Sequence, residues 1–202
     1  MKDTQITSLE VLRKALKPGR TYRRRDLLIY SSNLDRHLPV LVKEGTLRKL
    51  RQGLYARSKP TEFGNAPPTE NELLESFLRD NHFVVFGPTA FNSLGLGTTQ
   101  VYNQRVVLNR KRHGEFKLGG RTYFFHRRME VPRKLTKEFL FVEMLNRLDT
   151  LAEEREQVLS SLKSRIKDFD YHSLKKSLAK YGTYSTRLKL EPLLKENVSH
   201  GS

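Results

Sequence analysis

Residues 21–59 have the sequence TYRRRDLLIYSSNLDRHLPVLVKEGTLRKLRQGLYARSK, the most informative stretch of this chain. Its middle part carries an apolar face at helical spacing, formed by Leu34, Leu38, Leu41 and Val42. Gly45 comes directly after this run, where a glycine usually ends a helix. We therefore expect a helix that ends before Gly45. Pro39 predicts a bend near Leu38 or a later start, because proline lacks a backbone donor.

Two short strand-like runs follow this helix, and Arg51-Gln52-Gly53 lies between them. Their apolar residues are Leu47, Leu50, Leu54 and Tyr55. Gly53 can adopt the positive φ that a hairpin turn requires. Upstream, Thr21 is expected to cap a helix that extends to about Tyr30. Two helices and a basic hairpin are typical of a winged helix-turn-helix, in which the second helix enters the major groove of DNA.

Basic and polar residues of this stretch are candidate DNA contacts. Three consecutive arginines fall in the first turn of the expected helix 21–30, where cations oppose the helix dipole. A nearby phosphate would relieve that conflict, and a solvated run of charge is the alternative interpretation. The predicted contact residues are Arg23, Arg24, Arg25, Asn33, Arg36, His37, Lys43, Arg48, Lys49, Arg51 and Gln52.

The charge of the chain points to a polyanionic partner. The 202 residues carry a formal net charge of +16. Residues 1–60 hold 15 Lys and Arg against 5 Asp and Glu, a net charge of +10. Double-stranded DNA is therefore the expected partner. A membrane is not expected as a partner, because no convincing amphipathic helix with an aromatic face is present. The alternative is a basic helical hairpin that binds no DNA.

Composition also indicates the compartment. The chain has no cysteine, which fits a reducing compartment. Its first residues lack the apolar centre of a signal peptide, and the longest apolar runs, such as Phe83–Phe86, are too short to span a bilayer. We expect a soluble, cytoplasmic protein, and its oligomeric state stays open.

The whole chain is predicted to have an α+β fold. Three prolines and a glycine within residues 59–68 indicate a linker at 61–68. This linker would separate a winged helix-turn-helix domain, 1–60, from an α+β domain, 69–202, that has a helical C-terminal part. Strands are expected at 82–86, 105–109, 115–118 and 122–127. Helices are expected at 8–16, from Thr69, and at 90–94, 136–148, 151–166, 171–181 and 185–196.

Two segments share a pattern with a known family. The first is Leu41–Tyr55, a helix, a glycine and a basic strand that leads into Arg51-Gln52-Gly53-Leu54-Tyr55. The second is GPTAFNSLGL at 87–96, followed by the expected strand at Val106-Val107-Leu108 and then by the run Gly119-Gly120-Arg121-Thr122-Tyr123. Together they resemble AbiEi-type antitoxins of type IV toxin–antitoxin systems, over roughly residues 8–148. Pro39 departs from the family pattern.

The resemblance implies a bacterial regulator. Its N-terminal domain would bind operator DNA and repress its own operon. The remainder would counter a toxin that resembles a nucleotidyltransferase, without a stable complex between the two proteins.

Sequence motifs for catalysis are sparse. There is no paired-His metal spacing, no Walker loop and no GxSxG, and the six histidines are scattered. We therefore expect no enzyme activity, cofactor or metal. Glu115-Phe116-Lys117 is the E-x-K half of a metal-dependent nuclease site, but no Asp or Glu occurs from Gly87 to Gly114. A nuclease targeted by a winged helix is the alternative function, and an adaptor that binds an acidic toxin or RNA is a third.

Overall fold

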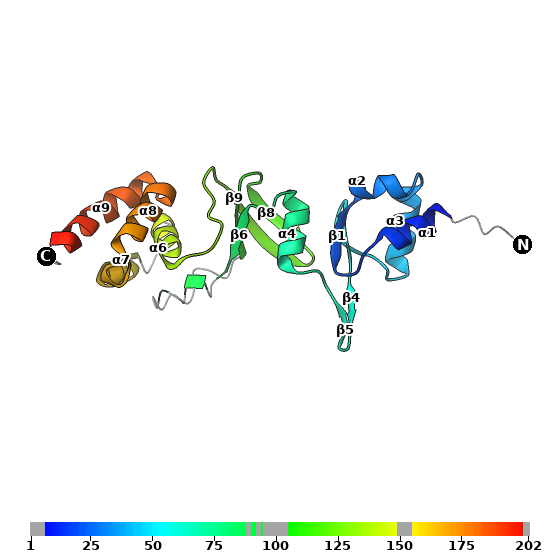
Figure 1. Cartoon of the computed structure of the whole chain (residues 1–202), viewed down its shortest axis with the longest axis horizontal. Coiled ribbons are helices and arrows are strands. Elements are labelled where there is room, and N and C mark those ends of the chain that lie inside the picture. Colours follow the sequence, from blue (N-terminus) through cyan, green and yellow to red (C-terminus); the bar gives the residue numbers. More distant parts are fainter. Residues whose placement is uncertain (1–6, 88–89, 92–93, 95–104, 149–154, 200–202) are drawn as a thin grey trace, which may run out of the picture. The chain divides into compact units, whose positions relative to one another are not determined.

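The computed structural model describes residues 7–87, 90–91, 94, 105–148 and 155–199. Helices and small sheets alternate along the chain, so the fold is mixed α+β (Figure 1). The chain forms two compact units, Met1–Asn81 with Phe116–Thr122, and His82–Glu115 with Tyr123–Ser202. The predicted boundaries at 60 and 69 both lie inside the first unit. Of the helix expected at 90–94, only three residues are among those described.

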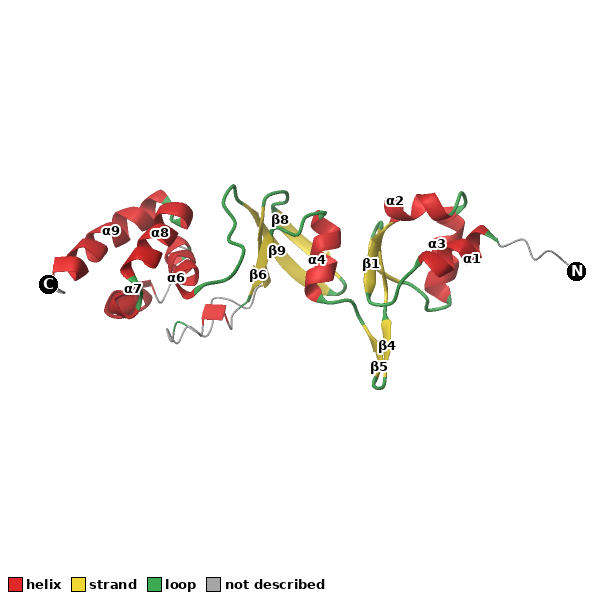
Figure 2. Cartoon of the chain, viewed as in Figure 1, coloured by secondary structure: helices red, strands yellow, loops and turns green. Residues whose placement is uncertain are grey.

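The first unit begins with four helical segments and three strands (Figure 2). Their bounds are α1 Ser8–Ala15, β1 Arg20–Arg23, α2 Arg24–Leu27, the 3-10 helix η1 Leu28–Tyr30, α3 Leu34–Lys43, β2 Arg48–Arg51 and β3 Leu54–Arg57. The three strands form an antiparallel sheet in the order β1-β3-β2. Thr7 caps α1 and Glu10 returns the hydrogen bond, which is a capping box. Leucines from α1 and α3 form the core against Leu27, Leu47 and Tyr55.

The helix predicted at 21–30 is wrong for its first part. Residues 20–23 instead form β1, in which Thr21 lies opposite Ala56 of β3. Thr21 does not cap a helix, because it lies within β1 and its hydroxyl makes no hydrogen bond among the described residues, while its backbone N–H donates to the Glu72 carboxylate (3.2 Å). A local pattern of charged residues could not reveal this strand, since its partner β3 lies about thirty residues further along the chain.

Pro39 does not interrupt α3, which runs as one helix from Leu34 to Lys43. The Pro39 ring lies on the exposed side of the helix, and Leu34, Leu38 and Leu41 are buried on the opposite side. Burial of leucines both before and after the proline stabilises the helix and offsets the missing hydrogen bond.

The region predicted as a linker forms a hairpin. Strands β4 (Lys59–Thr61) and β5 (Gly64–Ala66) pair antiparallel, and Gly64 has a φ of +108°. Proline is tolerated here because the two strands form a sheet of their own, so each has an edge that needs no hydrogen-bond partner. Phe63 lies in the connecting turn and is fully exposed.

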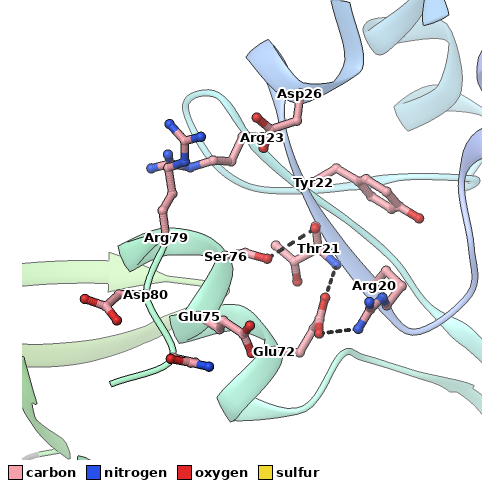
Figure 3. A pocket seen from close by; sticks show the side chains of 11 residues that line it. Arg20, Thr21, Tyr22, Arg23, Asp26, Glu72, Glu75, Ser76, Arg79 and Asp80 are labelled. Atoms are coloured by element: carbon pink, nitrogen blue, oxygen red, sulfur yellow. Dashed lines mark hydrogen bonds and ion pairs between the residues drawn. The ribbon is translucent and has the colours of Figure 1, made fainter. Parts of the chain in front are cut away.

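Helix α4 (Glu70–Leu78) is bonded to β1 and therefore belongs to the first unit. Arg20 pairs with Glu72 (2.8 Å), and Ser76 donates to the Thr21 carbonyl (3.3 Å) (Figure 3). Arg23 donates to the Phe77 carbonyl (3.1 Å). Cutting the chain at residue 60 would remove all three of these contacts.

The rest of the chain forms a mixed sheet and a group of helices, most of which belong to the second unit. The bounds are β6 Phe83–Phe86, β7 Arg105–Asn109, β8 Gly114–Leu118, β9 Arg121–Arg127, α6 Lys137–Asn146, α7 Arg155–Arg165, the 3-10 helix η3 Ile166–Asp168, α8 Tyr171–Tyr181 and α9 Tyr184–Ser199. The sheet order is β6-β7-β9-β8, in which β7 and β9 are parallel. The connecting hairpin of β8 and β9, residues 116–122, is part of the first unit. None of the described helices is both long and apolar enough to cross a membrane.

Helix α6 lies at the centre of the second unit and is buried from Phe139 to Leu145. Its one buried acid, Glu143, has no exposed surface and pairs with Arg128 (2.6 Å) and Arg147 (2.8 Å). Asn146 also donates to this carboxylate (3.3 Å). Two cations and an amide therefore satisfy a charge that would otherwise be very unfavourable in the interior.

His126 of β9 lies beside this cluster and is partly buried. Burial lowers the pKa of His126 from its ordinary value of 6.5 to about 4, and the charges of Arg147 and Arg128 act in the same direction. Glu143 opposes this shift, and the His113 ring packs edge-on against His126 at 5.6 Å. The imidazole is therefore neutral in the folded protein at pH 7.

We expect acid to destabilise the protein through His126. Its folded-state pKa is below the unfolded value, so the unfolded chain binds the proton first, and stability falls as the pH drops from about 6.5 towards 4. Urea unfolding at pH 7 and pH 5 measures the effect. His126→Gln should flatten this dependence, whereas His172→Gln, which alters an exposed histidine, should not. An unchanged pH dependence in His126→Gln would contradict the assignment.

Candidate nucleic-acid interface

Helix α3 exposes one polar face. Arg36, Val40 and Lys43 follow one another at intervals of four and three residues, so they share a side of the helix, and all three are exposed. Arg36 and Lys43 form no ion pair with another described residue. Asn33 occupies the N-cap position, but its side chain makes no cap hydrogen bond. The face therefore offers two cations and one amide that are available to a ligand.

Both ends of α3 are attached to neighbouring helices by ion pairs. At its start, Arg24 of α2 makes a two-pronged contact with Asp35, one bond being 2.6 Å long. This hydrogen bonding lowers the pKa of the Asp35 carboxyl. At its end, Arg13 of α1 pairs with Glu44 (2.8 Å). Such contacts hold the exposed face in one orientation, which lowers the entropy cost of binding.

The β2–β3 hairpin is bonded to other parts of the first unit. Arg48 donates to the Gly119 carbonyl (3.1 Å), and the Gly119 N–H donates to the Leu50 carbonyl (3.3 Å). The guanidinium of Arg51 lies 5.2 Å from the ring centre of Phe77 and 5.4 Å from that of Phe116. These are cation–π distances. Arg48 and Arg51 thus hold the hairpin against α4 and the 116–122 turn.

The eleven predicted contact residues fall into three groups. Five are exposed or half-exposed but already bonded within the protein: Arg23, Arg24, His37, Arg48 and Arg51. His37, for example, shares a 2.8 Å hydrogen bond with the buried Ser31 hydroxyl. One, Arg25, is exposed with Asp26 at 3.8 Å. The side chains of the remaining five are exposed and make no hydrogen bond or ion pair with another described residue: Asn33, Arg36, Lys43, Lys49 and Gln52.

Three apolar side chains are exposed on α3 and on the 3-10 helix before it, and the sequence did not predict the exposure of two of them. Leu28 and Ile29 of η1 are 47% and 80% exposed, and Val40 of α3 is 42% exposed. No local signal marked Leu28 and Ile29 as surface residues, whereas the helical spacing that predicts the buried face of α3 leaves Val40 outside that face.

A cavity of about 550 Å³ lies between β1 and α4 in the first unit (Figure 3). Three arginines line it, but so do four carboxylates, and the Arg20–Glu72 pair is one of the resulting bonds. The Thr21 hydroxyl is buried there and has no hydrogen-bond partner among the described residues. With charges of both signs in near balance, this cavity does not favour a nucleic-acid phosphate.

The E-x-K pair of the nuclease alternative lies on β8. Glu115 and Lys117 are both exposed. Within the described ranges, no group of three or more His, Asp or Glu residues is arranged to hold a metal ion. These two residues therefore lack nearby partners for a metal-dependent nuclease site in that part of the chain.

Comparison with known proteins shows a likeness to a solved structure. No protein-family model matches the chain, and no curated protein matches it. A crystal structure of the RV2827C protein from Mycobacterium tuberculosis superposes with a TM-score of 0.55. The match covers 93% of this chain and 74% of that one, with 18% of residues identical. At this identity the likeness concerns the fold alone.

Proposed function

We propose that residues 8–57 form a winged helix-turn-helix that binds double-stranded DNA. The element order of the first unit, helix-strand-helix-helix-strand-strand, supports this proposal, as does the sheet order β1-β3-β2. In such a domain α3 would enter the major groove, and the β2–β3 hairpin would follow the backbone.

The observation that carries the proposal is the exposed face of α3. Arg36 and Lys43 lie on that face without an acidic partner among the described residues, and Asn33 lies at its start. Arginine and asparagine are the side chains that most often read guanine and adenine edges. The net charge of +10 on residues 1–60 would attract DNA to this face.

We further infer a regulatory role, as the antitoxin of a type IV toxin–antitoxin pair. This part rests on the resemblance of 41–55 and 87–96 to AbiEi-type antitoxins. The protein would be cytoplasmic and would repress its own operon, and the rest of the chain would counter a toxin that resembles a nucleotidyltransferase.

Salt dependence tests the DNA-binding proposal. Fluorescence anisotropy with duplex DNA from the region upstream of the gene should show binding that weakens steeply as salt rises. Each phosphate that is neutralised contributes a slope of about −0.9 to log K against log salt, so three contacts predict a slope of about −3. Affinity that stays constant between low and moderate salt would contradict the proposal.

Growth and promoter activity test the antitoxin role. The full chain should restore growth when a toxin gene adjacent to its own is induced, and it should lower the output of a reporter fused to the upstream DNA. Repression without protection would leave the protein as a DNA-binding regulator and remove the antitoxin role.

A further inference from the structure

A second cavity, of about 480 Å³, lies within the second unit and is strongly basic. Its charged lining consists of Arg110, Arg133, Lys134, Lys176, Lys180 and a single acid, Glu130. They come from the residue after β7, from the connection between β9 and α6, and from α8. The fold therefore brings cations together from three segments that are distant in sequence.

Among the described residues, one of these cations has an acidic partner. Lys180 lies 3.4 Å from Glu130, and both side chains are about half exposed. Arg110, Arg133, Lys134 and Lys176 form no ion pair with any residue that the structure describes. Lys176 and Lys180 lie one turn apart on α8, a spacing at which like charges destabilise a helix. A bound anion would relieve this repulsion.

The connection that carries Arg133 and Lys134 is held in place on both sides. Before it, Val131 is 3% exposed, and the His82 Nε2–H donates to its carbonyl (2.9 Å). After it, the Thr136 hydroxyl accepts from the Phe139 N–H (3.2 Å) and caps α6. The two cations thus lie on a segment that is fixed before a ligand arrives, which favours binding.

Aromatic residues complete the lining. The rings of Phe139 and Tyr181 pack edge to face at 5.1 Å, and both residues border the cavity. Phe139 is buried, whereas Tyr181 keeps part of its surface. A cavity of this volume falls within the range of small-molecule sites, about 300–1,000 Å³. The combination of clustered cations and an aromatic ring matches a nucleotide, whose phosphates are anionic and whose base can stack.

We propose that this cavity binds a nucleoside polyphosphate, with Arg133 and Lys176 as principal phosphate contacts and Tyr181 beside the base. The site is separate from the α3 face, and the inference does not depend on the proposed DNA binding.

Isothermal titration of the full chain with ATP, sodium triphosphate and adenosine tests the proposal. We expect one ATP per chain, weaker binding of triphosphate and no detectable binding of adenosine, because the phosphates supply most of the attraction. The double variant Arg133→Gln/Lys176→Gln should bind ATP at least tenfold more weakly. Lys175→Gln is the matched control, because Lys175 is the exposed neighbour on α8 that does not line this cavity, and its ATP affinity should be unchanged.

Several results would overturn the proposal. One is the absence of ATP and triphosphate binding by the wild-type chain. A second is an equal loss of affinity in Lys175→Gln, which would indicate attraction by the general charge of the protein. A third result would come from titrating the same chains with duplex DNA in place of ATP. If the double variant loses DNA affinity and the wild-type chain binds no ATP, the cations contact nucleic-acid backbone instead. Thermal unfolding of each variant shows whether the fold is retained, and all three substituted positions, Arg133, Lys175 and Lys176, are exposed.

Discussion

Glu143→Ala is expected to lower the free energy of unfolding by about 3–5 kcal/mol, the usual cost of breaking a buried ion pair by removing one partner. Glu143 is fully buried and bonds to Arg128 at 2.6 Å and to Arg147 at 2.8 Å. After the substitution both guanidinium groups would remain near the core without their anion. The lost side chain would also leave a small cavity in α6.

Urea unfolding monitored by circular dichroism measures this loss. Glu130→Ala is the matched control, because it removes the same side chain from an ion pair that is about half exposed. Such surface pairs contribute about 0–1 kcal/mol. Glu143→Gln keeps the shape and some hydrogen bonds, so it should fall between the two. If Glu143→Ala destabilised the protein no more than Glu130→Ala does, the buried cluster would not have the stabilising role assigned to it.

Arg36→Ala is expected to weaken binding to the upstream DNA more than binding to random DNA. A well-made base contact contributes about 1–3 kcal/mol of discrimination, which corresponds to a factor of roughly 5 to 150 in affinity. Lys43→Ala should weaken both DNAs similarly if Lys43 contacts a phosphate, because phosphate contacts carry no sequence information. Anisotropy titrations with the two duplexes at one salt concentration distinguish these results.

Arg51→Ala is the comparison variant on the hairpin. Since Arg51 stacks on Phe77 and Phe116, its loss should reduce stability, by about 0.5–1 kcal/mol for each partly exposed cation–π contact. Its effect on DNA discrimination should be small. If Arg51→Ala abolished discrimination while Arg36→Ala preserved it, the hairpin and not α3 would be the element that reads bases.

The sequence alone located the elements whose signals are local. Leu34, Leu38 and Leu41 predicted the buried side of α3, and all three are buried. Gly45 and Gly53 were predicted as a helix end and a turn, and both have positive φ angles, +79° and +72°. The strand at 105–109 and the helix at 171–181 match their predicted bounds. Periodicity and glycine positions express backbone geometry over a few residues, so they can be interpreted without a fold.

Tertiary structure decided which charged side chains are available to a ligand and which helices and strands belong to each unit. Residues 20–23 became a strand because β3 pairs with them, and α4 joined the first unit because Glu72 and Ser76 bond to β1. Arg48 and Arg51 look equivalent to Arg36 in the sequence, yet only Arg36 is without an internal partner among the described residues. Each of these outcomes depends on contacts between residues about 30 to 70 positions apart. A charged side chain can contact a ligand only when folding leaves it without a partner inside the protein. Local sequence patterns contain no information about such long-range pairing.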